Sequence, residues 1–146
     1  MSLLDTNVVS ELRRASRADC RVAAWADSVP IEEMWLSCIS ILELDTGVLL
    51  LSRRDAAQGA LIGEWIDGHV LRAFAGRILP VDTAVARRCA TLQVPTTRPY
   101  RDSLIAATAL VHGLTVVTRN EADFAAMVPV IMNPRQWQVP GTAAEH

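Results

Sequence analysis

The stretch SLLDTNVVSEL, residues 2–12, predicts how the chain begins to fold. Residues 2–4 form a short apolar run of the kind found in a buried strand. Asp5, Thr6 and Asn7 then supply capping side chains for a helix that runs through Leu12 to Arg13. A strand, a turn and a helix therefore begin within the first dozen residues, as they do in parallel α/β proteins.

The same alternation continues along the chain. Further strands are expected over residues 34–38, 77–81, 114–117 and 128–132. Further helices are expected over 19–28, from just after Ser40, over 54–74, 82–92 and 102–112, with a short one around 123–124. This order predicts a three-layer α/β/α fold, with a central parallel sheet of four or five strands and helices on both faces.

Two local signals refine this prediction. Ser40 and Glu43 form an S-x-x-E capping box, which places the start of the third helix there and gives Glu43 a structural explanation. Pro129 falls inside the last strand, which suits an edge position because proline cannot donate a ladder hydrogen bond.

The length and composition indicate one soluble domain that meets a partner. A chain of 146 residues can bury one sizeable core, so we expect a single domain over residues 1–137 and a loose tail over 138–146. The hydrophobic fraction of 51% exceeds the need of an ordinary monomer, which indicates that some apolar surface is covered by another chain. We find no secretion signal and no membrane helix in the sequence.

Charge and cysteine content exclude several other classes. A net charge of −2 argues against coating of nucleic acid through bulk attraction. All 14 cationic side chains are Arg. Arg can form bidentate hydrogen bonds with phosphate, but the absence of Lys can equally reflect genomic base composition. Cys20, Cys38 and Cys89 are odd in number and widely spaced, so neither a disulfide framework nor a zinc site is expected and the cytoplasm is the natural compartment.

Acidic side chains are predicted to gather at the carboxyl ends of the strands, where ligands bind in such sheets. Asp5 follows the first strand, Glu43 lies shortly after the second, and Asp123 follows the strand over 114–117. Asp102 comes from the start of a helix instead. Taken singly, each acid is explained as a helix cap or a solvated group, but their convergence would be costly without a cation.

The chemistry of these acids favours metal-dependent hydrolysis of phosphodiester bonds. Carboxylate oxygens without thiolates or paired histidines suit Mg²⁺ or Mn²⁺ better than structural zinc. Such an ion activates water, so that no protein nucleophile is required. This agrees with the lack of a credible Ser-His-Asp or Cys-His pattern in the sequence.

An ordered series of motifs resembles a known family. The series consists of LLDTNVVSEL at the N-terminus, SILELDTG over 40–47, D-x-x-IAATA over 102–109, LTVVTRNxxDF over 114–124, and Asn133-Pro134. It resembles the PIN-domain ribonucleases, and among them the VapC-type toxins of type II toxin–antitoxin pairs, including the FitB-like branch. The resemblance covers nearly the whole chain.

The resemblance implies a function and a set of site residues. It implies a PIN-like fold, Mg²⁺- or Mn²⁺-dependent cleavage of RNA, a homodimer and inhibition by a small cognate antitoxin. It also allows a heterotetramer or larger assembly with antitoxin and operator DNA. By motif position, the catalytic acids would be Asp5, Glu43 and Asp102, which would also bind the metal together with Asp123. Supporting hydrogen bonds would come from Thr6, Asn7, Thr118 and Asn120. Asn120 is a departure, since many relatives place Asp there.

Arginines near these acids are candidates for RNA contact. The candidates are Arg13 and Arg14, with Arg17 and Arg21 beside them, and Arg98 and Arg101, which flank Asp102. Their alternative explanation is a solvated face or pairing with antitoxin carboxylates. Trp65, Leu61 and residues 49–51 fit a core, a dimer contact or an antitoxin groove.

Two other functions are compatible with parts of the sequence. A phosphatase or receiver domain would use Asp5 to accept phosphate, but there is no DxDxT pattern and no Lys to balance a phosphoryl group. A non-catalytic PIN-like module that acts with an antitoxin on operator DNA stays open because of Asn120.

Overall fold

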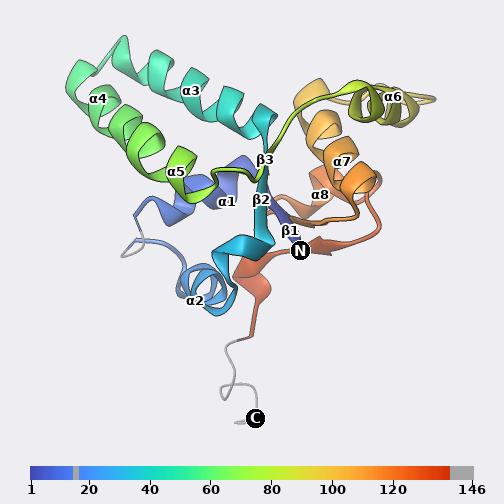
Figure 1. The fold of residues 1–146 in the computed structure, drawn as a ribbon, viewed down its shortest axis with the longest axis horizontal. Helices are drawn as coiled ribbons and strands as arrows, with labels where there is room; N and C mark the ends of the chain where they lie inside the picture. Colours follow the sequence, from blue (N-terminus) through green and yellow to red (C-terminus); the bar gives the residue numbers. More distant parts are fainter. Residues whose placement is uncertain (15–16, 139–146) are drawn as a thin grey trace.

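The computed structural model describes residues 1–14 and 17–138 of the chain (Figure 1). Its strands are β1 (Ser2–Leu4), β2 (Met34–Ser37), β3 (Ile78–Leu79), β4 (Thr115–Val117) and β5 (Ile131–Met132). All neighbouring strands pair in parallel, in the order β3-β2-β1-β4-β5. The predicted parallel sheet is therefore confirmed, and β5 occupies the predicted edge; because β5 begins at Ile131, Pro129 lies before the strand and not inside it as predicted.

Helices flank this sheet. They are α1 (Thr6–Leu12), α2 (Cys20–Ser28), α3 (Cys38–Ser52), α4 (Ala56–Trp65), α5 (Leu71–Ala73), α6 (Thr83–Leu92), α7 (Tyr100–His112) and α8 (Glu121–Phe124). Short 3₁₀ turns cover Ile31–Glu33 and Pro134–Gln136. Figure 1 shows α3, α4 and α5 on one side of the sheet and α6 and α7 on the other. The expected loose tail over 138–146 lies outside the described residues except for Gln138.

Alternating strand residues divide the core into two faces. Leu3 pairs in register with Val116, and both belong to a buried cluster with residues of α7 and α8. The next pair, Leu4 and Val117, belongs to a cluster with residues of α1, α2 and the segment around Phe74. Side chains alternate across a strand, so both faces of the sheet are covered and the three-layer architecture follows.

The start of α3 corrects the capping-box prediction. The helix begins at Cys38, and Ser37 caps it by accepting a hydrogen bond from the Ile39 N–H at 3.0 Å. Ser40 is buried inside the first turn, so it cannot cap the helix. Glu43 consequently has no capping role in α3.

The start of α7 corrects the explanation of Asp102 as a cap. The helix begins at Tyr100, directly after Pro99, and has no side-chain cap. Asp102 lies within the first turn. As predicted, α7 ends at His112; the capping residue Gly113 has a φ of 67°, in the left-handed region that glycine adopts without strain.

The long helix predicted over 54–74 is confirmed from Ala56 to Ala73, although it begins two residues later and contains a π-helical turn. Asp55 caps α4 through the Gln58 N–H at 3.0 Å, so residue 54 lies outside it. After Trp65 the chain makes a wider π-helical turn over Ile66–Val70 and then the short α5. Ile66 and Val70 are both buried in this turn, and their core contacts override the regular helical spacing.

A close contact between α3 and α4 makes Gly59 sensitive to substitution. A Cβ at Gly59 would lie 2.9 Å from the Ser52 Cα, which is backbone and cannot rotate away. We expect Gly59→Ala to lower the free energy of unfolding by about 1–3 kcal/mol, as overpacking does. Gly47→Ala in α3 is the matched control, because a Cβ there meets nothing within 4 Å; it should raise the unfolding free energy by about 0.5–1 kcal/mol. Urea titration of both variants measures the difference, and equal stability of the two would contradict it.

Candidate acidic site

Asp5 lies at the carboxyl end of β1, where it also caps α1. Its side chain is only 7% exposed. One carboxylate oxygen accepts a hydrogen bond from the Thr6 N–H at 2.8 Å, and the other accepts one from the Thr118 hydroxyl at 2.9 Å. Thr118 directly follows β4, the neighbour of β1, so the parallel pairing of these strands brings the two residues together.

Thr6 links Asp5 to Glu43. Its hydroxyl donates to Glu43 Oε1 at 2.9 Å, across the space between the first turn of α1 and the second turn of α3. Arg101 approaches the other oxygen of Glu43, with 3.9 Å between Nη1 and Oε2. Because the Arg101 side chain is 63% exposed, this ion pair is weak.

Asp102 and Asp123 interact electrostatically with the acids described above. Burial raises the pKa of Asp5 above its ordinary value of 3.8, the hydrogen bonds from Thr118 and Thr6 oppose this, and the charges of Glu43 and Asp102 raise it further. Burial also raises the pKa of Asp102; Asp123 and Glu43 add to that shift, and Arg101 opposes it. We call Asp5, Glu43 and Asp102 the acidic site; Asp123 lies exposed beside it.

The segment after β4 is fixed by the other predicted polar residues. The Asn120 N–H donates to the Thr118 hydroxyl oxygen at 3.0 Å. The Arg119 N–H donates to the Asn7 side-chain oxygen at 3.4 Å. Asn120 thus precedes α8 as a backbone donor, and its own side chain makes no capping hydrogen bond.

The donor chemistry of the acidic site fits a hard divalent cation. In the described part of the chain, no three Asp, Glu, His or Cys side chains are arranged to hold a metal ion as they stand. The three acids are therefore close enough for their charges to interact, but their oxygens are not arranged around a single point. Oxygen-only donors and a buried, repelled carboxylate at Asp5 are nevertheless what Mg²⁺ or Mn²⁺ would stabilise.

The candidate arginines differ in their surroundings. Arg98 stabilises the loop in which it lies. Its Nε donates to the Leu92 carbonyl at 3.1 Å, and its backbone N–H donates to Gln93 Oε1 at 2.9 Å. Arg101 lies beside Glu43, and Arg14 is exposed. Arg13 lines a pocket together with Thr6 and Glu43.

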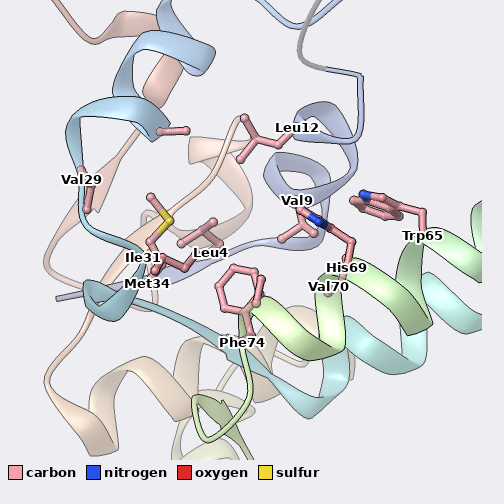
Figure 2. Close-up of a pocket in the computed structure, with 12 residues that line it drawn as sticks. Leu4, Val9, Leu12, Val29, Ile31, Met34, Trp65, His69, Val70 and Phe74 are labelled. Atoms are coloured by element: carbon pink, nitrogen blue, oxygen red, sulfur yellow. The ribbon is translucent and has the colours of Figure 1, made fainter.

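Two pockets meet at Trp65. One has a volume of about 280 Å³ and reaches the acidic site through Thr6 and Glu43. The other, of about 170 Å³, is lined by apolar side chains from β1, α1, β2 and the π-helical turn, with His69 at its rim (Figure 2). This second pocket contains no carboxylate, so it is separate from the acidic site.

A buried ion network behind α1 is absent from the sequence-based candidates. Glu11, with a side chain 8% exposed, accepts from Arg135 Nη2 at 2.9 Å and lies 3.7 Å from Arg119 Nη1. Arg119 lies between Thr118 and Asn120 in the chain. Its contacts with Glu11 and Asn7 therefore attach the segment that carries the Thr118 hydroxyl to α1. The only signals in the sequence were the positions of Glu11 and Arg119 within the quoted motifs.

The raised pKa of Asp5 predicts a stability change. The folded carboxyl group binds its proton more tightly than the unfolded chain, so stability falls as the pH rises above 3.8 and through the raised value. At neutral pH without added metal, Asp5→Asn removes the unfavourable free energy of the buried charge. The amide can still form hydrogen bonds with the Thr6 N–H and the Thr118 hydroxyl. We expect a gain of about 1 kcal/mol, or roughly 2–4 °C in Tm. Calorimetry in EDTA at pH 4 and pH 7 tests this, and a variant that melts lower than the parent at pH 7 would contradict it.

The fold and the site together define a class: a parallel α/β domain with acidic side chains gathered at the carboxyl ends of its inner strands. The chain belongs to the PIN-domain family, because the PIN domain matches residues 2–128. No described helix has both the length and the apolar character needed to cross a membrane.

Relatives within this family are similar over nearly their whole length. The chain is 40% identical over 139 residues to Toxin FitB of Neisseria gonorrhoeae, covering 92% of this chain and 98% of that protein. It is 40% identical over 142 residues to VapC ribonuclease Y4jK of Sinorhizobium fredii, covering 92% and 97%. The solved structure of FitAB bound to an IR36 DNA fragment has a TM-score of 0.83 and 37% identity, covering 94% of this chain and 98% of that one.

Proposed function

We propose that this chain is a VapC-type endoribonuclease, the toxin of a toxin–antitoxin pair, which hydrolyses RNA phosphodiester bonds. The observation that carries the proposal is the linkage of Asp5 to Thr118 and of Glu43 to Thr6 at the carboxyl ends of the central strands. The similarity to a VapC ribonuclease and to Toxin FitB supports the same class.

In this proposal Asp5, Glu43 and Asp102 bind Mg²⁺ or Mn²⁺, with Asp123 as an additional acid beside Asn120. When bound, such an ion activates water and stabilises negative charge on the departing oxygen. Burial, and then the charges of neighbouring carboxylates, raise the pKa values of Asp5 and Asp102, which is consistent with a need for a cation at this position.

The surrounding residues orient the acids. The Thr118 hydroxyl and the Thr6 N–H fix both oxygens of Asp5, so that its carboxylate cannot rotate freely. The Thr6 hydroxyl similarly fixes one oxygen of Glu43. Arg101 lies near the site with most of its side chain in solvent, where it can meet an RNA phosphate.

We also propose a cognate antitoxin and a homodimer as partners. Leu42, Leu49 and Leu50 on α3 and Leu61 on α4 expose between 53% and 68% of their surface, which is unusual for large apolar side chains. A second chain that covers this exposed face would explain why the hydrophobic fraction of the sequence is as high as 51%. Assembly with operator DNA fits the likeness to FitAB bound to DNA.

A cleavage assay with defined metal content tests the proposed activity. Protein purified free of antitoxin and dialysed against EDTA should leave RNA intact, and Mg²⁺ or Mn²⁺ should restore cutting. Addition of the antitoxin should stop it again. Metal binding without any cleavage of total cellular RNA would favour the alternative of a non-catalytic module that acts with an antitoxin on operator DNA.

A further inference from the structure

The pocket beside the acidic site has a wall of mixed chemistry. Thr6 and Glu43 form the part shared with the site, and Ser10 and Arg13 continue it along α1. Its volume of about 280 Å³ is close to the lower end of small-ligand pockets, roughly 300 Å³. The pocket can therefore admit one small unit of a larger ligand that also reaches the acids.

Arg13 is a cation without an anionic partner in the part of the chain that the structure describes. Arg14 and Arg17 follow α1 in the chain and lie close enough for their charges to act on Arg13. Burial, followed by the like charges of these two neighbours, lowers the pKa of Arg13. A partly buried guanidinium among like charges is a favourable position for an incoming phosphate.

The opposite wall is apolar and half-buried, with Leu44 buried in the core. It consists of Leu44, Val48, Ile62 and Trp65 from α3 and α4. Gly47 of α3 completes this wall, and a Cβ there would meet nothing within 4 Å. An indole and aliphatic side chains opposite a cation match the two parts of a nucleotide, its base and its phosphate.

We propose that this pocket is a nucleotide subsite, in which Arg13 binds a phosphate of single-stranded RNA and the wall around Trp65 receives the adjoining nucleoside. The subsite would hold the nucleotide next to the bond positioned at the acidic site. This proposal rests on the proposed ribonuclease function. It adds that the pocket selects single-stranded RNA. RNA is favoured over an acidic peptide because Thr6 and Glu43 belong to the pocket and to the site of the reaction.

Binding of RNA without metal tests the role of Arg13 separately from cleavage. The probe is a fluorescein-labelled single-stranded RNA of mixed sequence, about 12 nucleotides long, in EDTA, followed by fluorescence anisotropy. Arg13→Gln should weaken binding by about tenfold. It should also reduce the slope of log K against log salt by about 0.7, the contribution of one phosphate contact on a single strand. Arg87→Gln on the exposed face of α6 is the charge-matched control and should leave the slope nearly unchanged.

A second variant tests the apolar part of the pocket. Gly47→Leu adds a side chain to the pocket wall, where a Cβ meets nothing within 4 Å, and improves the helix propensity of α3; a urea titration beside the parent shows that the variant stays folded. We expect RNA affinity to fall by about tenfold with an unchanged salt slope, because no phosphate contact is removed. Anisotropy at several salt concentrations separates the two variants.

The outcomes distinguish this proposal from the proposed function. If metal-dependent cleavage occurs but Arg13→Gln and Gly47→Leu bind RNA like the parent, the subsite is overturned and the ribonuclease function stands. If both variants lose RNA binding while the parent never cleaves RNA, the subsite stands and the function fails. If Arg13→Gln weakens only antitoxin binding, the pocket is a protein-docking site and the proposal is overturned.

Discussion

Replacing Asp5 with Asn is expected to abolish metal-dependent RNA cleavage while the fold remains intact. Asp5 is the most enclosed acid of the site, and its oxygens are fixed by Thr6 and Thr118. The amide retains the shape of the side chain and loses its charge. The loss of several kcal/mol of transition-state stabilisation corresponds to a fall in rate of about 10³-fold. Rates measured on a labelled RNA at saturating Mn²⁺ give this ratio.

Asp45→Asn provides the matched control for this experiment. Asp45 is an exposed acid of α3, two residues from Glu43 and outside every side-chain contact described for the acidic site. The same change of charge there should leave the cleavage rate within about twofold, the effect of an ordinary surface substitution. Cleavage by Asp5→Asn at the parental rate would exclude Asp5 from the reaction.

Replacing Glu11 with Gln is expected to cause the largest loss of stability among substitutions outside the central core. Glu11 is almost fully buried and faces both Arg119 and Arg135. Without its charge, two guanidinium groups remain close together with no carboxylate between them. Breaking a buried pair costs about 3–5 kcal/mol; because the arginines are 32% and 42% exposed, we expect about 2–3 kcal/mol.

Arg21→Gln is the control for Glu11→Gln. Arg21 pairs with Asp19 at 3.0 Å, but this ion pair lies in solvent, so its loss should change the free energy of unfolding far less than the loss of the Glu11 charge. Chemical denaturation measures both variants. If Glu11→Gln were as stable as Arg21→Gln, the buried network would have no structural role.

The sequence predicted the parts of this fold that depend on local patterns. Short apolar runs marked the strands, and the helices expected over 82–92 and 102–112 correspond to α6 and α7. The proximity of Asp5 to Thr118 followed from topology, since residues after neighbouring parallel strands meet at one edge.

Other features depend on contacts that local patterns do not reveal. Ser37 and Ser40 are both good N-cap residues, and only the end of β2 decides that Ser37 performs the capping. The π-helical turn after Trp65 was not predicted, because it depends on the burial of Ile66 and Val70 in the core. Glu11 and Arg135 are 124 residues apart in the chain, so their pairing emerges only when the last turn packs against α1.

Titration of EDTA-treated protein with Mn²⁺, followed by electron paramagnetic resonance of the free ion, tests the proposed metal site most directly. The parent and Asp45→Asn should bind Mn²⁺ with equal affinity, whereas Asp5→Asn and Glu43→Gln should bind at least about tenfold more weakly. Failure of the parent to bind Mn²⁺, or equal binding by Asp5→Asn, would contradict a metal site formed by Asp5, Glu43 and Asp102.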